Sequence, residues 1–97
     1  MKKTFKLVDE KRAPERVADK IKFEVKKYIK RERKKELPEG ADFWDFDCRI
    51  GSSEEAAKEI HEKEINKNID LMVSEKAESF YLEIMAKQAR RTRRLDK

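Results

Sequence analysis

The clearest strand pattern in this chain is the nonapeptide Asp42-Phe43-Trp44-Asp45-Phe46-Asp47-Cys48-Arg49-Ile50. Successive side chains of a β-strand point to opposite faces, so a period of two predicts a strand with one face in the core and one in water. The apolar face carries Trp44, Phe46, Cys48 and Ile50. The other face carries Phe43, Asp45, Asp47 and Arg49, which predicts a sheet that is solvated on one side.

Two further segments alternate in the same way. Residues 3–8 place Phe5 and Leu7 on one face, and residues 79–86 do so with Phe80, Leu82 and Ile84. The chain is therefore expected to form three strands, each with a single apolar face.

Helical spacing occupies the two intervals between these strands. Pro14 suits the first turn of a helix, and the proline of Leu37-Pro38-Glu39-Gly40 ends it. The apolar stripe of this helix is Val17, Ile21, Val25, Tyr28 and Ile29. Ser52 and Glu55 have the spacing of a capping box, which predicts a second helix that begins at Ser52 and ends near residues 74–77. Its expected inner stripe is Ala57, His61, Ile65, Ile69, Met72 and Val73.

The resulting fold class is α+β, in the order β-α-β-α-β. Sheets with one wet face take helices on the other face only, which predicts a two-layer sandwich of a three-stranded sheet and two helices. Strand order, and parallel or mixed pairing, stay open at this point. Residues 1–87 are expected to form one domain, and residues 88–97, which lack a period, a mobile basic tail.

Composition excludes several classes of protein. The chain has 97 residues, of which 48% are charged, and a formal net charge of +5. It contains no apolar run long enough for a membrane span or a signal peptide, so a cytoplasmic location is expected. A single cysteine, Cys48, cannot form an internal disulfide. No pattern points to a cofactor or a small-molecule substrate.

Charge is distributed unevenly along the chain. Residues 10–36 hold twelve basic and six acidic side chains, whereas residues 37–78 hold five basic and twelve acidic ones. The first helix carries a basic face with one aromatic, and the tail carries an arginine cluster. Lysine and arginine can bind phosphates, and a ring can stack on a base, so these residues predict nonspecific binding of RNA or DNA. The candidates are Arg16, Phe23, Lys26, Lys27, Lys30, Lys34, Arg90, Arg91, Arg93 and Arg94. A solvated lysine face is the plainer interpretation.

A second hypothesis is a protein-interaction or homodimerisation module. The predicted second helix is acidic and could bind a basic surface, including the basic helix of another copy; its acidic residues are Glu54, Glu55, Glu59 and Glu62. Phe43, Tyr81 and Met85 on the outer face of the sheet could line such a contact or stack bases.

Little in the sequence points to catalysis. Asp45 and Asp47 share one face and are a weak candidate for a Mg²⁺ or Ca²⁺ site, although a row of cross-strand charges explains them as well. His61 and Cys48 are expected on the inner side, as packed residues. An enzyme would need a cleft in which Asp45, Asp47 and His61 converge, and outer aspartates with an inner histidine are poorly placed for that. We therefore expect a non-enzymatic protein.

Three segments resemble a family of small bacterial proteins known only as a domain of unknown function. They are residues 1–7, residues 25–33 and, most specifically, Leu37-Pro38-Glu39-Gly40-Ala41-Asp42-Phe43-Trp44-Asp45-Phe46-Asp47-Cys48-Arg49. The resemblance implies a bacterial, cytoplasmic, single-domain protein. It implies no activity, cofactor or catalytic residue.

Overall fold

A computed structural model describes residues 1–90 of the chain and confirms the α+β class. The elements are β1 (Lys2–Lys6), α1 (Pro14–Arg33), β2 (Phe43–Gly51), β3 (Lys58–Ile60), the short 3₁₀ helix η1 (Glu62–Glu64), α2 (Ile65–Ser74) and β4 (Ser79–Ala89). The sheet has four strands, so the expectation of three was wrong.

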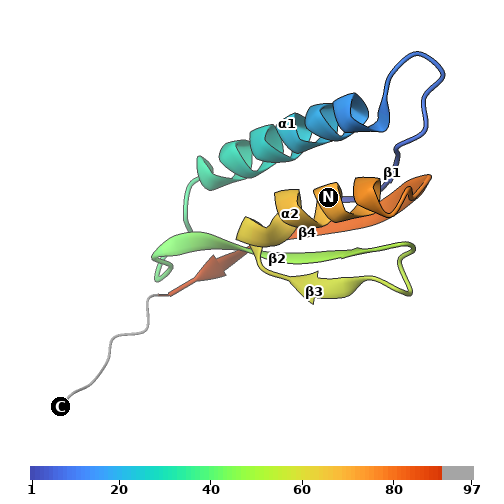
Figure 1. Cartoon of the computed structure of the whole chain (residues 1–97). Coiled ribbons are helices and arrows are strands. Elements are labelled where there is room, and N and C mark those ends of the chain that lie inside the picture. The colour runs from blue at the N-terminus through green and yellow to red at the C-terminus, as the bar shows by residue number, and fades with distance from the viewer. Residues whose placement is uncertain (91–97) are drawn as a thin grey trace.

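The sheet has the order β1-β4-β2-β3, and every neighbouring pair is antiparallel. This settles the pairing that the sequence left open. The long antiparallel pair β2–β4 forms the centre of the sheet, with Cys48 opposite Ile84 and Arg49 opposite Glu83. Both helices lie on the same side of the sheet (Figure 1). The other side therefore faces solvent, as the alternating pattern of β2 predicts.

The core lies between the helices and the inner face of the sheet. The central strand β4 contributes Phe80, Leu82 and Ile84, all fully buried, and the ring of Phe80 stacks on that of Phe5 with centroids 5.5 Å apart. Facing residues come from both helices and from β2: Ile21, Val25, Ile29, Ile65, Ile69, Phe46, Cys48 and Ile50. The apolar faces defined by a period of two in the strands and of 3.6 in the helices thus pack together in one cluster.

The second helix begins at Ile65, thirteen residues later than the capping-box pattern at Ser52 predicts. Residues 52–57 instead form a turn, and β3 follows and pairs with β2. The capping box of the structure lies at His61, whose Nδ1 accepts from the backbone N–H of Lys63, while Glu64 accepts from that of His61. His61 is exposed there, so its assignment to an inner helical stripe was also wrong.

Tertiary contacts explain why residues 52–57 do not become helical. The guanidinium of Arg49 donates to the carbonyls of Glu54 and Ala57, which holds this loop against the outer face of the sheet. Gly51 lies beneath the loop, where a Cβ atom would come within 2.6 Å of Ala57 Cα. A local capping pattern cannot compete with contacts that a helix would break.

β4 also extends further than its apolar alternation indicates. It runs to Ala89, and Gln88 and Ala89 pair with Trp44 and Phe43. The tail expected from residue 88 therefore begins with two residues of the sheet. At the other end of the chain, β1 stops at Lys6, although Leu7 is buried and donates its N–H to Glu78. Neither helix of residues 1–90 has both the length and the apolar composition that crossing a membrane requires.

Candidate nucleic-acid interface

The basic face is carried by α1. Pro14 begins the helix, where its missing N–H leaves no hydrogen bond unmade. Ala18, Ile21, Val25 and Ile29 recur every three or four residues and are buried against the sheet. This anchors one face of the helix and leaves Lys20, Lys26 and Lys27, which lie between these positions, exposed.

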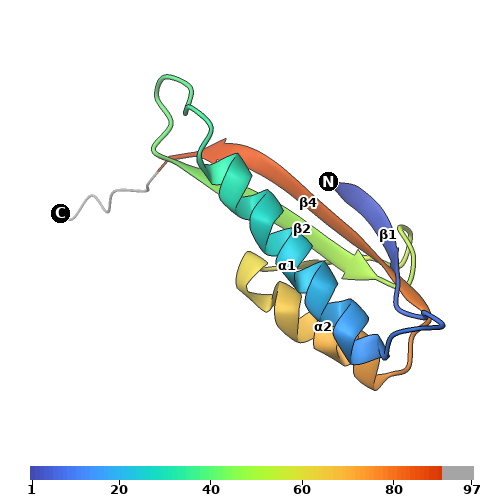
Figure 2. The same cartoon turned by 90° about the horizontal axis from the view of Figure 1, so that it is seen from above.

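Two ion pairs connect α1 to the segment η1–α2. Lys22 pairs with Asp70, and Arg33 pairs with Glu62, whose two oxygens lie 2.6 and 2.7 Å from one guanidinium nitrogen. The first residue of each pair advances along α1 while its partner moves back along η1–α2. The two helices are therefore antiparallel, as Figure 2 shows.

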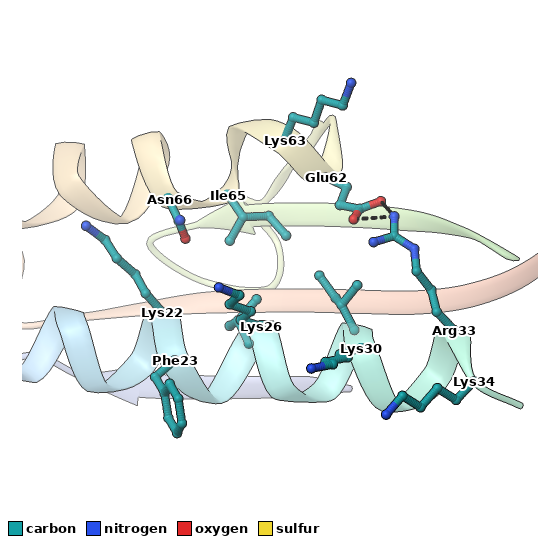
Figure 3. Close-up of a pocket in the computed structure, with 12 residues that line it drawn as sticks. Lys22, Phe23, Lys26, Lys30, Arg33, Lys34, Glu62, Lys63, Ile65 and Asn66 are labelled. Carbon is teal, nitrogen blue, oxygen red and sulfur yellow. Dashed lines mark hydrogen bonds and ion pairs between the residues drawn. The ribbon is translucent and has the colours of Figure 1, made fainter.

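Between these ion pairs lies a groove of about 650 Å³. Its apolar lining residues are Phe23, Val25, Ile29 and Ile65. Six basic side chains and one acidic side chain line it as well, so its edges are strongly positive; these are Lys22, Lys26, Lys30, Arg33, Lys34, Lys63 and Glu62. Figure 3 shows Glu62 held by Arg33 at one end, and Lys63 pointing away from α1.

Three of the predicted binding residues lie together on this groove: Lys26, Lys30 and Lys34. All three are exposed, and none forms an ion pair with another of residues 1–90. Their charges are therefore not neutralised within the described chain and are available to an anionic partner.

Phe23 also borders the groove, but its ring points away from α2 (Figure 3). Its side chain is 63% exposed, and the ammonium of Lys27 lies 5.6 Å from the ring centroid. The predicted pair Phe23 and Lys27 thus forms a separate aromatic–cation contact on the outer side of α1.

The remaining predicted residues lie elsewhere. Arg16 borders a hollow at the beginning of α1 with Lys11 and Arg12. Arg90 follows β4 and lies beside Gly40, in the loop after α1. Arg91, Arg93 and Arg94 fall outside the described residues.

The acidic helix of the alternative hypothesis does not exist. Glu54 and Glu55 lie in the turn after β2, Glu59 lies in β3, and Glu62 begins η1. Tyr81 is also unavailable for stacking, because it is only 6% exposed and its hydroxyl donates to Glu83. Burial and this hydrogen bond raise the pKa of Tyr81 to about 12. Phe43 and Met85 are exposed on the outer face.

The outer face of the sheet carries the cross-strand charges that the alternation predicts. Arg49 lies opposite Glu83 and pairs with it at 3.3 Å, and Lys87 pairs with Asp47 at 2.8 Å. The hydrogen bond and the charge of Asp47 raise the pKa of Lys87. Asp45 accepts from the backbone N–H of Phe46. Within residues 1–90 no three side chains of His, Cys, Asp or Glu come together as metal ligands.

One hollow does bring Asp45, Asp47 and His61 together, contrary to the expectation of opposite faces. It measures about 340 Å³ and lies where β3 ends and leaves the edge of β2 uncovered. Two of its polar groups already have partners, since Lys87 holds Asp47 and the Nδ1 of His61 accepts from Lys63. One atom of each of these two groups is therefore engaged in a contact within the fold.

Cys48 borders this hollow but is fully buried. Burial, and then the nearby carboxylates of Glu62, Asp47 and Asp45, raise the pKa of the thiol to about 11. We expect no alkylation of Cys48 by iodoacetamide near neutral pH until the protein is unfolded in urea, because the reactive thiolate is scarce and covered. Mass spectrometry of native and unfolded samples measures this, and rapid labelling of the native protein would contradict it.

The sequence did not single out four residues that line the groove, and it named Glu62 only as part of an acidic helix. The four are Lys22, Arg33, Lys63 and Asn66, which come from two segments that are far apart in sequence. The signal for Lys22 was its spacing of four from Lys26, Lys30 and Lys34. That signal could be interpreted only with the true beginning of α2.

Comparison with known proteins places the chain in a family. A search of curated proteins and a search of solved structures both find no match. A family model described as "Family of unknown function (DUF6172)" matches residues 1–95, nearly the whole chain. The expected resemblance to a family of unknown function is therefore confirmed, and this chain belongs to the family of unknown function DUF6172.

Proposed function

We propose that this protein is a non-enzymatic module that binds RNA or DNA without sequence specificity, in the bacterial cytoplasm. The observation that supports the proposal best is the row of exposed lysines, Lys26, Lys30 and Lys34, without ion-pair partners among residues 1–90. Because these charges are not paired within the described part of the fold, they are available to phosphates.

The chemistry of this surface fits sequence-independent binding. Positions four apart on a helix are about 6 Å apart along its axis, so the lysines form a regular series of like charges. A phosphodiester backbone is a complementary series of opposite sign. Base-specific reading needs several fixed donors and acceptors, such as a bidentate arginine or amide. Around the groove, Asn66 is the one neutral polar side chain among those described.

The test is charge reversal in the triple variant Lys26→Glu, Lys30→Glu, Lys34→Glu. We expect affinity for a short mixed-sequence RNA to fall at least about tenfold, and its salt dependence to become shallower, because fewer phosphates are neutralised. Fluorescence anisotropy at low and moderate salt measures both quantities.

The matched control reverses three exposed lysines outside the groove, Lys6→Glu, Lys20→Glu and Lys67→Glu. It makes the same change in net charge, so it separates a local site from general attraction. Equal losses in both triple variants, or unchanged binding in the first, would refute the assignment. Far-UV circular dichroism of each variant checks that the fold persists.

A protein-interaction or homodimerisation module remains the alternative. The acidic helix that this alternative assumed is absent from the described residues, but Phe43 and Met85 are exposed on the uncovered face of the sheet. Concentration-dependent sedimentation at low salt, together with no binding of nucleic acid, would favour this alternative.

A further inference from the structure

One edge of the sheet is only partly covered. The strand β3 pairs with the second half of β2 alone, where its partners are Cys48, Arg49 and Ile50. The chain then leaves the sheet at His61, because η1 begins at Glu62 and leads into α2. Among residues 1–90, the first half of β2 therefore has a neighbouring strand, β4, on one side only, as Figure 1 shows.

The register identifies the backbone groups at this uncovered edge. Ile84 of β4 donates its N–H to Met1, on the side of β1. Amide directions alternate along a strand, so the next residue of β4 points to β2, where its partner is Asp47. The same alternation in β2 turns the N–H and C=O groups of Trp44 and Phe46 away from β4. The edge thus presents the backbone of these two residues to an added strand.

A side chain of β2 occupies one of these backbone groups. The Oδ1 atom of Asp45 accepts from the N–H of Phe46 at 2.9 Å, in the place that a carbonyl of an added strand would take. The carbonyl of Phe46 accepts a long contact of 3.9 Å from the thiol of Cys48. An added strand would therefore displace one local hydrogen bond, and the carboxylate of Asp45 would become available to a cation.

The hollow beside this edge, of about 340 Å³, is acidic. Its charged lining residues are all carboxylates: Asp45, Asp47, Glu59 and Glu64. Lys87 pairs with Asp47, whereas the other three form no ion pair within the described part of the chain. The hollow therefore attracts a cationic segment and repels the phosphates of a nucleic acid.

The spacing of the carboxylates specifies the arrangement of such a segment. Asp45 and Asp47 are two residues apart and share the outer face of the sheet, and side chains on one face of neighbouring strands lie beside one another. We propose that this edge of β2 binds an extended segment of a partner protein as an added strand, with lysine or arginine at alternate positions. This surface is separate from the lysine groove and goes beyond the proposed function.

A second copy of this chain matches the edge less well. Its β1, at the opposite edge of the sheet, carries Lys2 and Lys6 on one face, four residues apart, with Thr4 between them. Joining β1 of one copy to β2 of the next would also continue without closing into a finite assembly. Two β2 edges would bring the aspartates 45 and 47 of both copies together, and like charges in opposite positions are destabilising.

The test uses a fluorescent peptide with the repeated sequence Arg-Thr, in which arginines alternate with a residue that favours strands. We expect the double variant Asp45→Asn, Glu59→Gln to bind it about fivefold to tenfold more weakly, because two carboxylates lose their charge. The matched control is Glu10→Gln, Asp19→Asn, which makes the same change in net charge at exposed residues away from the edge. Its affinity should equal that of the wild type. Fluorescence anisotropy with the full chain measures all three proteins.

A second peptide tests whether a strand is added. A repeat of Arg-Pro carries the same charges but lacks half of the N–H groups, so it should bind at least about fivefold more weakly. On addition of the Arg-Thr peptide, the N–H groups of Trp44 and Phe46 should become protected from hydrogen exchange. Those of Asp45 and Asp47, which point to β4, should change less in amide NMR spectra.

Three outcomes would overturn the inference. Equal losses in the two double variants would show general attraction, and equal binding of the two peptides would show that no strand is added. Self-association in sedimentation at low salt that Asp45→Asn, Glu59→Gln abolishes would assign the edge to a second copy. None of these results bears on RNA binding by the groove, because its variants and its probe are different.

Discussion

Replacing Phe80 by alanine is expected to lower the free energy of unfolding by about 3–5 kcal/mol, the largest loss for any single change considered for this protein. Phe80 is fully buried in β4, the strand that connects β1 to β2. Its ring stacks on Phe5, its register partner in β1. The truncation removes apolar contact and leaves a cavity that neighbouring side chains fill only in part.

This loss is large for a domain of such size. The total stability of a small domain is about 5–15 kcal/mol, so the variant should be partly unfolded well below the wild-type melting temperature. Urea denaturation followed by circular dichroism measures the change. Met85→Ala is the control, because Met85 lies on the same strand but is exposed on the outer face. A change below about 1 kcal/mol for Phe80→Ala would contradict the central place of this ring in the core.

Gly51→Val is expected to cost about 1–3 kcal/mol or more through overpacking. A Cβ atom at this position would lie 2.6 Å from Ala57 Cα and 2.8 Å from the carbonyl oxygen of Ala56. Both neighbours are backbone atoms, so the loop 52–57 would have to move. That movement would break the hydrogen bonds from Arg49 to the loop.

Ser52→Val is the control for this prediction. It introduces the same side chain one residue later, at an exposed position, where substitutions usually change stability by less than about 0.5 kcal/mol. The difference between the two variants in urea denaturation isolates the close approach of the loop. Equal midpoints for both variants would show that the loop leaves the sheet at little cost.

Alternation and helical spacing predicted the longest elements well. β2, with its buried Phe46, Cys48 and Ile50, and α1, with its buried Ile21, Val25 and Ile29, were expected from local periodicity. These patterns are reliable because burial of one face imposes the same spacing wherever the partner lies. The same reasoning failed between residues 52 and 64. The two short elements there, β3 and η1, bury little surface, so their sequence shows no periodic spacing of apolar residues.

The candidate site was predictable only in part. The exposed lysines of α1 follow from the helical spacing of its buried stripe. The second wall of the groove does not, because Ser52 and Glu55 suggested a helix that begins thirteen residues too early.

By itself the sequence determines which faces are apolar, which helix is basic and that the chain forms one α+β fold, because each of these depends on the spacing of neighbouring residues. Tertiary structure alone decides the antiparallel strand order, the loop held over Gly51 and the groove between α1 and α2. The ion pairs that bound this groove join residues 29 and 48 positions apart. Such pairs form only once the shared core has placed both helices on one sheet, since contacts at that separation depend on packing rather than on local spacing.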